Sequence, residues 1–172
     1  MSPAYTPYIF PLLVGFFLSI SLVIFTRRQP HVQGVKLFSF MLLTTALWCG
    51  TYAIAISQTT VASILFWSNV VFFAIVTLPV ALLLFCYAFT GAAHRLTPRF
   101  VGLLFAEPLL VVVGIWTDGW HGLFRQTVVL DVNGPFDTIA VTFGPLFWVH
   151  TLYSYGCILW GIALLVKAYR HA

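Results

Sequence analysis

Five long apolar runs, separated by short polar joins, dominate the pattern along the chain. The runs cover residues 8–26, 37–56, 61–89, 100–116 and 145–166. An α-helix rises 1.5 Å per residue and a bilayer core is about 30 Å thick, so about 20 apolar residues are enough to span it. The pattern therefore predicts five transmembrane helices. The run at 61–89 exceeds a perpendicular span, and Pro79 within it is the predicted site of a kink.

The join at 117–144 is long, and its second half has the pattern of a β-hairpin. Two stretches rich in β-branched residues, 127–132 and 137–143, flank the sequence Asn133-Gly134-Pro135. An Asn-Gly pair suits the positive φ angles of a tight hairpin turn, although the following proline can impose a longer loop. An isolated hairpin is marginal in water, so we expect this one to pack on the ends of the helices.

Composition excludes a water-soluble domain, a disordered tail, a coiled coil and a disulfide scaffold. The 172 residues are 61% hydrophobic and 7% charged, with a mean hydropathy of +1.01. A soluble domain is about 25% charged, and eight basic and four acidic side chains cannot cover a globule of this size. We therefore predict an all-α integral membrane protein. It forms a five-helix transmembrane bundle in one membrane domain over residues 1–172, with one extracellular β-hairpin loop.

The charges predict how the bundle is oriented. Seven of the eight basic residues lie in alternate joins or after the last run, without an acid beside them: Arg27, Arg28, Lys36, Arg95, Arg99, Lys167 and Arg170. The other joins hold Arg125 with Asp118, Asp131 and Asp137. The positive-inside rule then places the N-terminus outside and the C-terminus in the cytoplasm of a multi-pass protein of the plasma membrane. Because the cations lie between apolar runs, we expect the lipid bilayer and no nucleic acid as a partner.

Glu107 is an acidic residue inside an apolar run, and Pro108 follows it. A polar group in hydrocarbon is costly and is a functional candidate by default. Glu107 is either a proton-sensitive or ligand-facing carboxylate, or a structural group bonded to a hydroxyl, amide or backbone group of a neighbouring helix. We expect it to be protonated at neutral pH and to face the bundle interior.

Other polar and aromatic residues form stripes on the predicted helices. His150, Tyr153, Ser154, Cys157 and Gly161 share one face of the last helix, and Thr45, Trp48, Cys49 and Tyr52 form a similar line. Such stripes either line a pocket in the outer half of the bundle or form interhelical hydrogen-bonded seams. The candidate ligand-binding residues are Trp48, Tyr52, Asn69, Glu107, Trp120, His121, Trp148, His150 and Tyr153. We expect no catalytic residue, cofactor or metal, because the histidines and cysteines are too scattered for a ligand set.

Several short motifs follow one another in a familiar order. They are Arg27-Arg28, Ala46-Leu47-Trp48, Glu107-Pro108, the aromatic and glycine-rich stretch 116–124, and residues 144–150 followed by Tyr153-Ser154-Tyr155. Their order and spacing over nearly the whole chain resemble the N-terminal seven-transmembrane sensory region of archaeal and bacterial sensor histidine kinases. The resemblance implies an input module for two-component signal transduction, whose chemistry resides in a downstream cytoplasmic kinase.

The family region has seven helices, whereas this sequence predicts five, so we expect either a fragment of a receptor or a stand-alone five-helix protein. The sequence contains neither a phosphoacceptor histidine motif nor an ATP-binding lid, and we expect no enzymatic activity from it. The leading hypothesis is a sensory module that binds a small apolar or aromatic ligand and forms a homo-dimer or larger membrane assembly. The alternative is a structural or assembly subunit of a larger membrane complex. A small transporter that uses Glu107 is a third hypothesis.

Overall fold

The computed structural model describes residues 6–29, 31–134 and 137–170, and within them it has five helices long and apolar enough to cross a membrane. These are α1 (Thr6–Arg27), α2 (Val35–Ala55), α3 (Val61–Phe89), α4 (Pro98–Trp116) and α6 (Pro145–Arg170). A short 3-10 helix, η2 (Ala93–Arg95), precedes α4, and a one-turn helix, α5 (Asp118–His121), follows it. The five predicted spans are confirmed, whereas α5 is an element that the apolar pattern does not predict.

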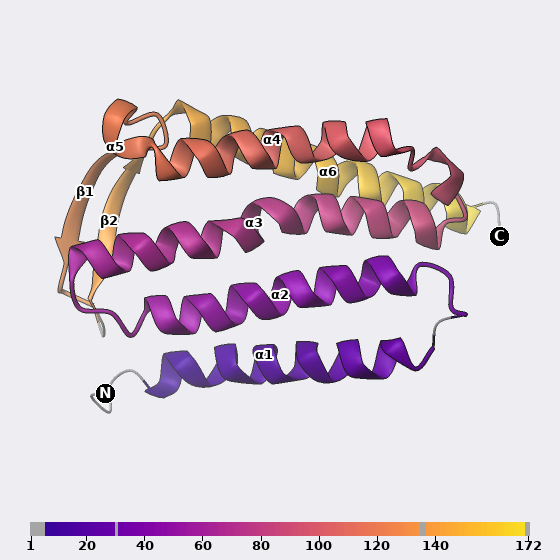
Figure 1. Cartoon of the computed structure of the whole chain (residues 1–172), viewed down its shortest axis with the longest axis horizontal. Helices are drawn as coiled ribbons and strands as arrows, with labels where there is room; N and C mark the ends of the chain where they lie inside the picture. The colour runs from indigo at the N-terminus through magenta and orange to yellow at the C-terminus, as the bar shows by residue number, and fades with distance from the viewer. Residues whose placement is uncertain (1–5, 30, 135–136, 171–172) are drawn as a thin grey trace.

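The helices lie roughly antiparallel, with α3 at the centre of the bundle (Figure 1). Helices α1, α2 and α3 lie side by side in chain order, and α4 and α6 pack on the other side of α3. Threonine hydroxyls cap two of the helices: Thr60 Oγ1 accepts a hydrogen bond from the Ser63 amide, and Thr97 Oγ1 accepts one from the Phe100 amide. The central helix is thus positioned by neighbours on both sides.

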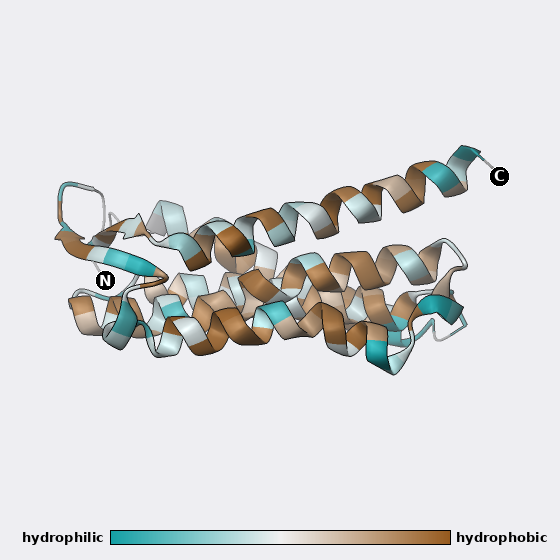
Figure 2. Cartoon of the chain, turned by 90° about the horizontal axis from the view of Figure 1, so that it is seen from above, coloured by the Kyte–Doolittle hydropathy of each residue, from teal (hydrophilic) through white to brown (hydrophobic). Residues whose placement is uncertain are grey.

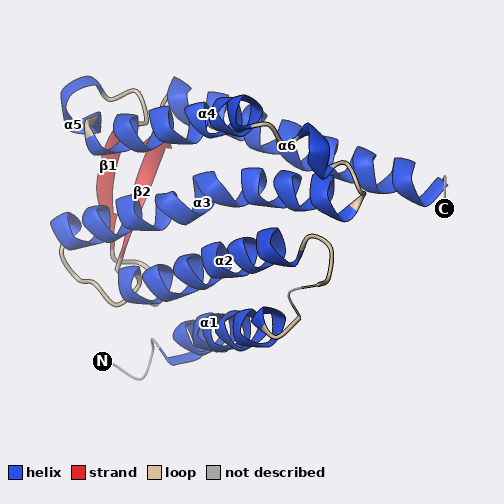
Figure 3. Ribbon diagram, turned by 45° about the vertical axis from the view of Figure 1, so that its right-hand side comes forward, coloured by secondary structure: helices blue, strands red, loops and turns tan. Residues whose placement is uncertain are grey.

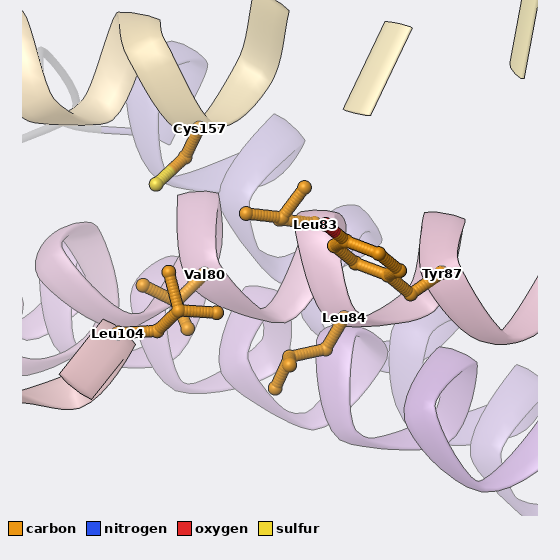
Figure 4. Close-up of a cluster of buried hydrophobic side chains, with 6 residues drawn as sticks. All are labelled: Val80, Leu83, Leu84, Tyr87, Leu104 and Cys157. Carbon is orange, nitrogen blue, oxygen red and sulfur yellow. The ribbon is translucent and has the colours of Figure 1, made fainter. Parts of the chain in front are cut away.

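One buried cluster joins α3 to α4 and α6 (Figure 4). It contains Val80, Leu83, Leu84 and Tyr87 of α3, Leu104 of α4 and Cys157 of α6. Gly161 lets α6 approach α3 closely, because a Cβ atom at this position would lie 3.1 Å from the Cys86 sulfur. Small residues at a helix contact are a common means of close packing in membrane bundles.

The two ends of the bundle differ in what they carry. The hairpin end holds the start of α1, the α2–α3 join, α5 and the hairpin, and the basic end holds the α1–α2 join, the α3–α4 join and the end of α6 (Figures 1 and 3). Hydrophilic residues gather towards both ends, and hydrophobic residues cover most of the length between them (Figure 2). This distribution suits a bundle that spans a bilayer along its long axis.

The predicted hairpin is confirmed. Strands β1 (Arg125–Asp131) and β2 (Thr138–Phe143) are antiparallel, with Asp131 opposite Thr138 and a register irregularity between Arg125 and Thr127. Residues 132–137 connect the strands, so Asn133 and Gly134 lie in a longer loop than a two-residue turn; Pro135 is outside the described residues. The Asn133 backbone and side-chain amides both donate to Asp131 Oδ1. Figure 3 shows the hairpin crossing the bundle from α4 and α6 towards α2.

Candidate functional site

Arg125 fastens the base of the hairpin to α3. Its Nη1 donates to Asn69 Oδ1 at 2.8 Å, and its Nη2 donates to Ser68 Oγ at 3.2 Å. The guanidinium carbon also lies 5.6 Å and 5.3 Å from the ring centroids of Phe72 and Phe124. The Arg125 side chain is buried, and burial lowers the pKa of its guanidinium while the charge of Asp118 acts in the opposite direction. A buried cation needs such partners, so these contacts fix where β1 begins.

Asp118 and His121 hold the turn between α4 and β1. The two carboxylate oxygens of Asp118 accept hydrogen bonds from the amides of Phe124 and Arg125, at 2.8 Å and 2.9 Å. His121 Nδ1 accepts from the Leu123 amide, and its Nε2 pairs with Thr117 Oγ1. Both ring nitrogens of His121 are therefore engaged in holding the loop.

A cavity of about 170 Å³ lies at the hairpin end, between α2, α3 and the beginning of β2. Its walls are mostly aliphatic and aromatic. Its polar residues are Tyr52 and Ser68 on the helices, and Asp137 and Thr138 at the beginning of β2. The lining residues are Tyr52, Ala55, Ile56, Ile64, Ser68, Val71, Phe72, Ile75, Asp137, Thr138 and Ile139. Ser68 connects this cavity to Arg125, because its hydroxyl accepts the guanidinium hydrogen bond.

The structure does not gather the nine predicted site residues in one place. Tyr52 lines the cavity, and Asn69 stands beside it as a partner of Arg125. Trp48 is not among the lining residues, and Trp120 and Trp148 are 90% and 59% exposed. None of these three tryptophans therefore lines this cavity.

Glu107 and His150 form a second polar pair, between α4 and α6. Glu107 Oε1 lies 3.0 Å from His150 Nδ1, and the side chains are 17% and 5% exposed. Glu107 thus faces a neighbouring helix as predicted, but its partner is an imidazole and not a hydroxyl, amide or backbone group. His150 Nε2 pairs in turn with Ser154 Oγ at 3.2 Å. Among the described residues, Glu107 Oε2 is the one buried side-chain oxygen or nitrogen without a hydrogen-bond partner.

Tyr153 completes the contact between these two helices. Its hydroxyl donates to the Leu104 carbonyl oxygen at 2.6 Å. In a regular helix that carbonyl would accept from the amide four residues later, but the residue there is Pro108, which has no N–H. The polar face of α6 therefore acts as an interhelical seam, in which Tyr153 replaces a missing helical hydrogen bond.

The sequence did not identify Arg125 and Asp137 as site residues of the hairpin end. Arg125 is the one basic residue in the joins that contain aspartates, but its partners on α3 lie 56 and 57 residues away in the sequence. No sequence pattern indicated that Asp137 lies at a cavity, because its position there depends on how far the hairpin reaches across the bundle. Across the described ranges, no group of three or more histidine, cysteine, aspartate or glutamate side chains could hold a metal ion.

No curated protein and no solved structure is significantly similar to this chain. A family model does match, described as the N-terminal 7TM region of histidine kinase, and the match covers residues 11–172. The matched part includes Arg125 with its partners on α3, the pair of Glu107 and His150, and every residue that lines the cavity. The chain therefore belongs to the family of N-terminal seven-transmembrane regions of histidine kinases.

Proposed function

We propose that this chain is a sensory input module that binds a small apolar or aromatic molecule in the cavity at the hairpin end. The observation that carries the proposal is the cavity itself, which is walled by α2, α3 and β2. Its volume of about 170 Å³ is close to that of an engineered cavity of roughly 150 Å³ that binds benzene. One ring with a small substituent is therefore a suitable size of ligand.

The position of the cavity suits a sensory role. Its largest wall is α3, which also packs against α4 and α6, so a bound molecule acts on the helix that joins the two sides of the bundle. A second wall is β2, whose partner strand is fastened to α3 through Arg125. A ligand that binds one packing of α3 and the hairpin better than another shifts the population towards that packing.

We also propose an orientation for the bundle and a separation of sensing from phosphoryl transfer. The hairpin end faces outside and the basic end faces the cytoplasm, because seven of the eight basic residues lie at the basic end. The ligand then arrives from outside, and α6 carries the response towards the cytoplasm. The module itself is non-catalytic, and phosphoryl transfer belongs to a kinase domain downstream in receptors of this family.

Methyl NMR of the chain in lipid nanodiscs tests the binding step, with toluene as the probe. Ile56 and Ile64 line the cavity, whereas Ile162 of α6 is half exposed on the outside of the bundle. Toluene bound in the cavity shifts the two lining methyl signals saturably. Toluene dissolved in the bilayer shifts Ile162 without saturation.

Replacing each of two alanines with phenylalanine gives a test variant and its matched control. Ala55→Phe adds a ring inside the cavity and should abolish the saturable shifts, while Ala106→Phe adds the same ring on an exposed position of α4 and should leave them intact. Unchanged signals from isoleucines outside the cavity show that each variant is folded. Saturable shifts that persist in Ala55→Phe, or none in the native chain, would contradict ligand binding here and favour a purely structural subunit.

A further inference from the structure

We infer that the cavity selects an aromatic or aliphatic primary amine, held by the carboxylate of Asp137. The inference rests on the proposed ligand-binding function and names the chemical class of its ligand. Asp137 is half-buried, lies immediately before β2, and lines the cavity together with Thr138 and Ile139. It is the acidic residue among those that line the cavity.

The three aspartates at the hairpin end differ in what they bind. Both oxygens of Asp118 accept backbone hydrogen bonds, and Asp131 Oδ1 accepts two hydrogen bonds from Asn133. Within the part of the chain that the structure describes, Asp137 has no hydrogen bond or ion pair. A carboxylate at the edge of an apolar cavity is costly to desolvate when a ligand covers it, unless the ligand brings a cation or donors.

The remaining walls suit the other parts of such a ligand. Tyr52 and Phe72 present aromatic rings, which attract a cation near their faces and pack against a ring or an alkyl body. The aliphatic side chains of Ile64, Val71 and Ile75 line the part contributed by α3. The cavity thus combines one anionic group with an apolar body of ring size.

Arg125 is the group that would favour an anionic ligand instead, and its geometry argues against this. It does not line the cavity, and its Nη1 and Nη2 already donate to Asn69 and Ser68. The carboxylate of Asp118 also lies close enough to interact with its charge. Asp137 is therefore the charged group available to a molecule inside the cavity.

Three probes of the same size separate these possibilities: toluene, benzylamine and benzoate. Each is titrated at neutral pH into the full chain in nanodiscs of zwitterionic lipid, with the methyl signals of Ile56 and Ile139 as readout. A charge-assisted hydrogen bond increases affinity by about tenfold or more, so benzylamine should bind at least about tenfold more tightly than toluene. Benzoate should bind more weakly than toluene.

Two aspartate substitutions test whether Asp137 carries the preference. Asp137→Asn should remove the preference for benzylamine and leave toluene binding unchanged, which also shows that the variant is folded. Asp131→Asn makes the same change of charge on the same hairpin, at a carboxylate already bonded to Asn133, and should keep the preference.

The outcomes distinguish failure of the inference from failure of the proposed function. Equal binding of toluene and benzylamine would overturn the amine preference while the ligand-binding function stands. Tightest binding of benzoate would overturn it in favour of an anion site near Arg125. Saturable binding of none of the probes would overturn the proposed function itself.

Discussion

Replacing Tyr153 with phenylalanine should destabilise the bundle by leaving one backbone carbonyl without a donor. The Tyr153 hydroxyl donates to the Leu104 carbonyl oxygen at 2.6 Å, and Pro108 supplies no amide for the same oxygen. The substitution removes a single oxygen atom and keeps the ring, so packing against the core cluster changes little. The main effect is the loss of this hydrogen bond.

The magnitude follows from the lack of an alternative partner. Interhelical hydrogen bonds in membrane proteins contribute about 0.6 kcal/mol on average and up to about 1.7 kcal/mol, in part because the separated helices find other partners. The Leu104 carbonyl has no such partner within its own helix, because of Pro108. We therefore expect Tyr153→Phe to lower the free energy of unfolding by about 1.5 kcal/mol, near the upper end of this range.

A double-mutant cycle with Pro108→Ala isolates this effect. Alanine restores an amide at position 108, so the Leu104 carbonyl regains its helical donor and the tyrosine hydroxyl becomes less important. Unfolding in mixed micelles should then show that Tyr153→Phe costs about 1 kcal/mol less in the Pro108→Ala background. Tyr155→Phe, at an exposed position of the same helix, is the control and should change stability by less than about 0.5 kcal/mol. An equal cost of Tyr153→Phe in both backgrounds would refute the reasoning.

Three other expectations concern topology, the intramembrane carboxyl group and the base of the hairpin. A membrane-impermeant maleimide added to intact cells should label a cysteine introduced at Asp131 and miss one at Leu96; the reverse pattern would invert the proposed orientation. Glu107→Gln should fold and insert almost normally, whereas Glu107→Leu should cost about 1–2 kcal/mol in unfolding experiments, because it removes the partner of His150 Nδ1. Gly144→Ala should speed hydrogen exchange of the strand amides, because its Cβ would overlap a neighbouring backbone carbonyl. Gly102→Ala, where a Cβ meets open space, should leave exchange unchanged.

The spans were predictable because membrane thickness sets the minimum length of an apolar helix that crosses it. A run such as 61–89 becomes α3 whichever neighbours surround it, since a helix satisfies its own backbone groups in hydrocarbon. The hairpin was predictable for a similar local reason, because its two β-branched stretches are close in sequence. Each of these elements needs little information from the rest of the chain.

The candidate site was less predictable because apolar residues surround these helices on most sides. In a soluble helix the apolar stripe marks the buried face, but in a bilayer the lipid-facing side is equally apolar. Trp148 and Tyr153 therefore looked alike as pocket residues, although Trp148 is exposed and Tyr153 bonds to α4. The place of Asp137 at the cavity depends on where the hairpin lies, which no local pattern encodes.

The seam between α4 and α6 also has a consequence for the order in which the protein assembles during synthesis. The carbonyl of Leu104 and the carboxyl group of Glu107 belong to α4, but their partners on α6 come 49 and 43 residues later in the chain. A ribosome releases the chain from its N-terminus, so α4 emerges before either partner does. Until α6 arrives, α4 carries two unpaired polar groups, and leaving it alone in lipid is costly. The two helices should therefore insert into the bilayer as a pair. Until α6 has been synthesised, α4 should stay near water or the insertion machinery.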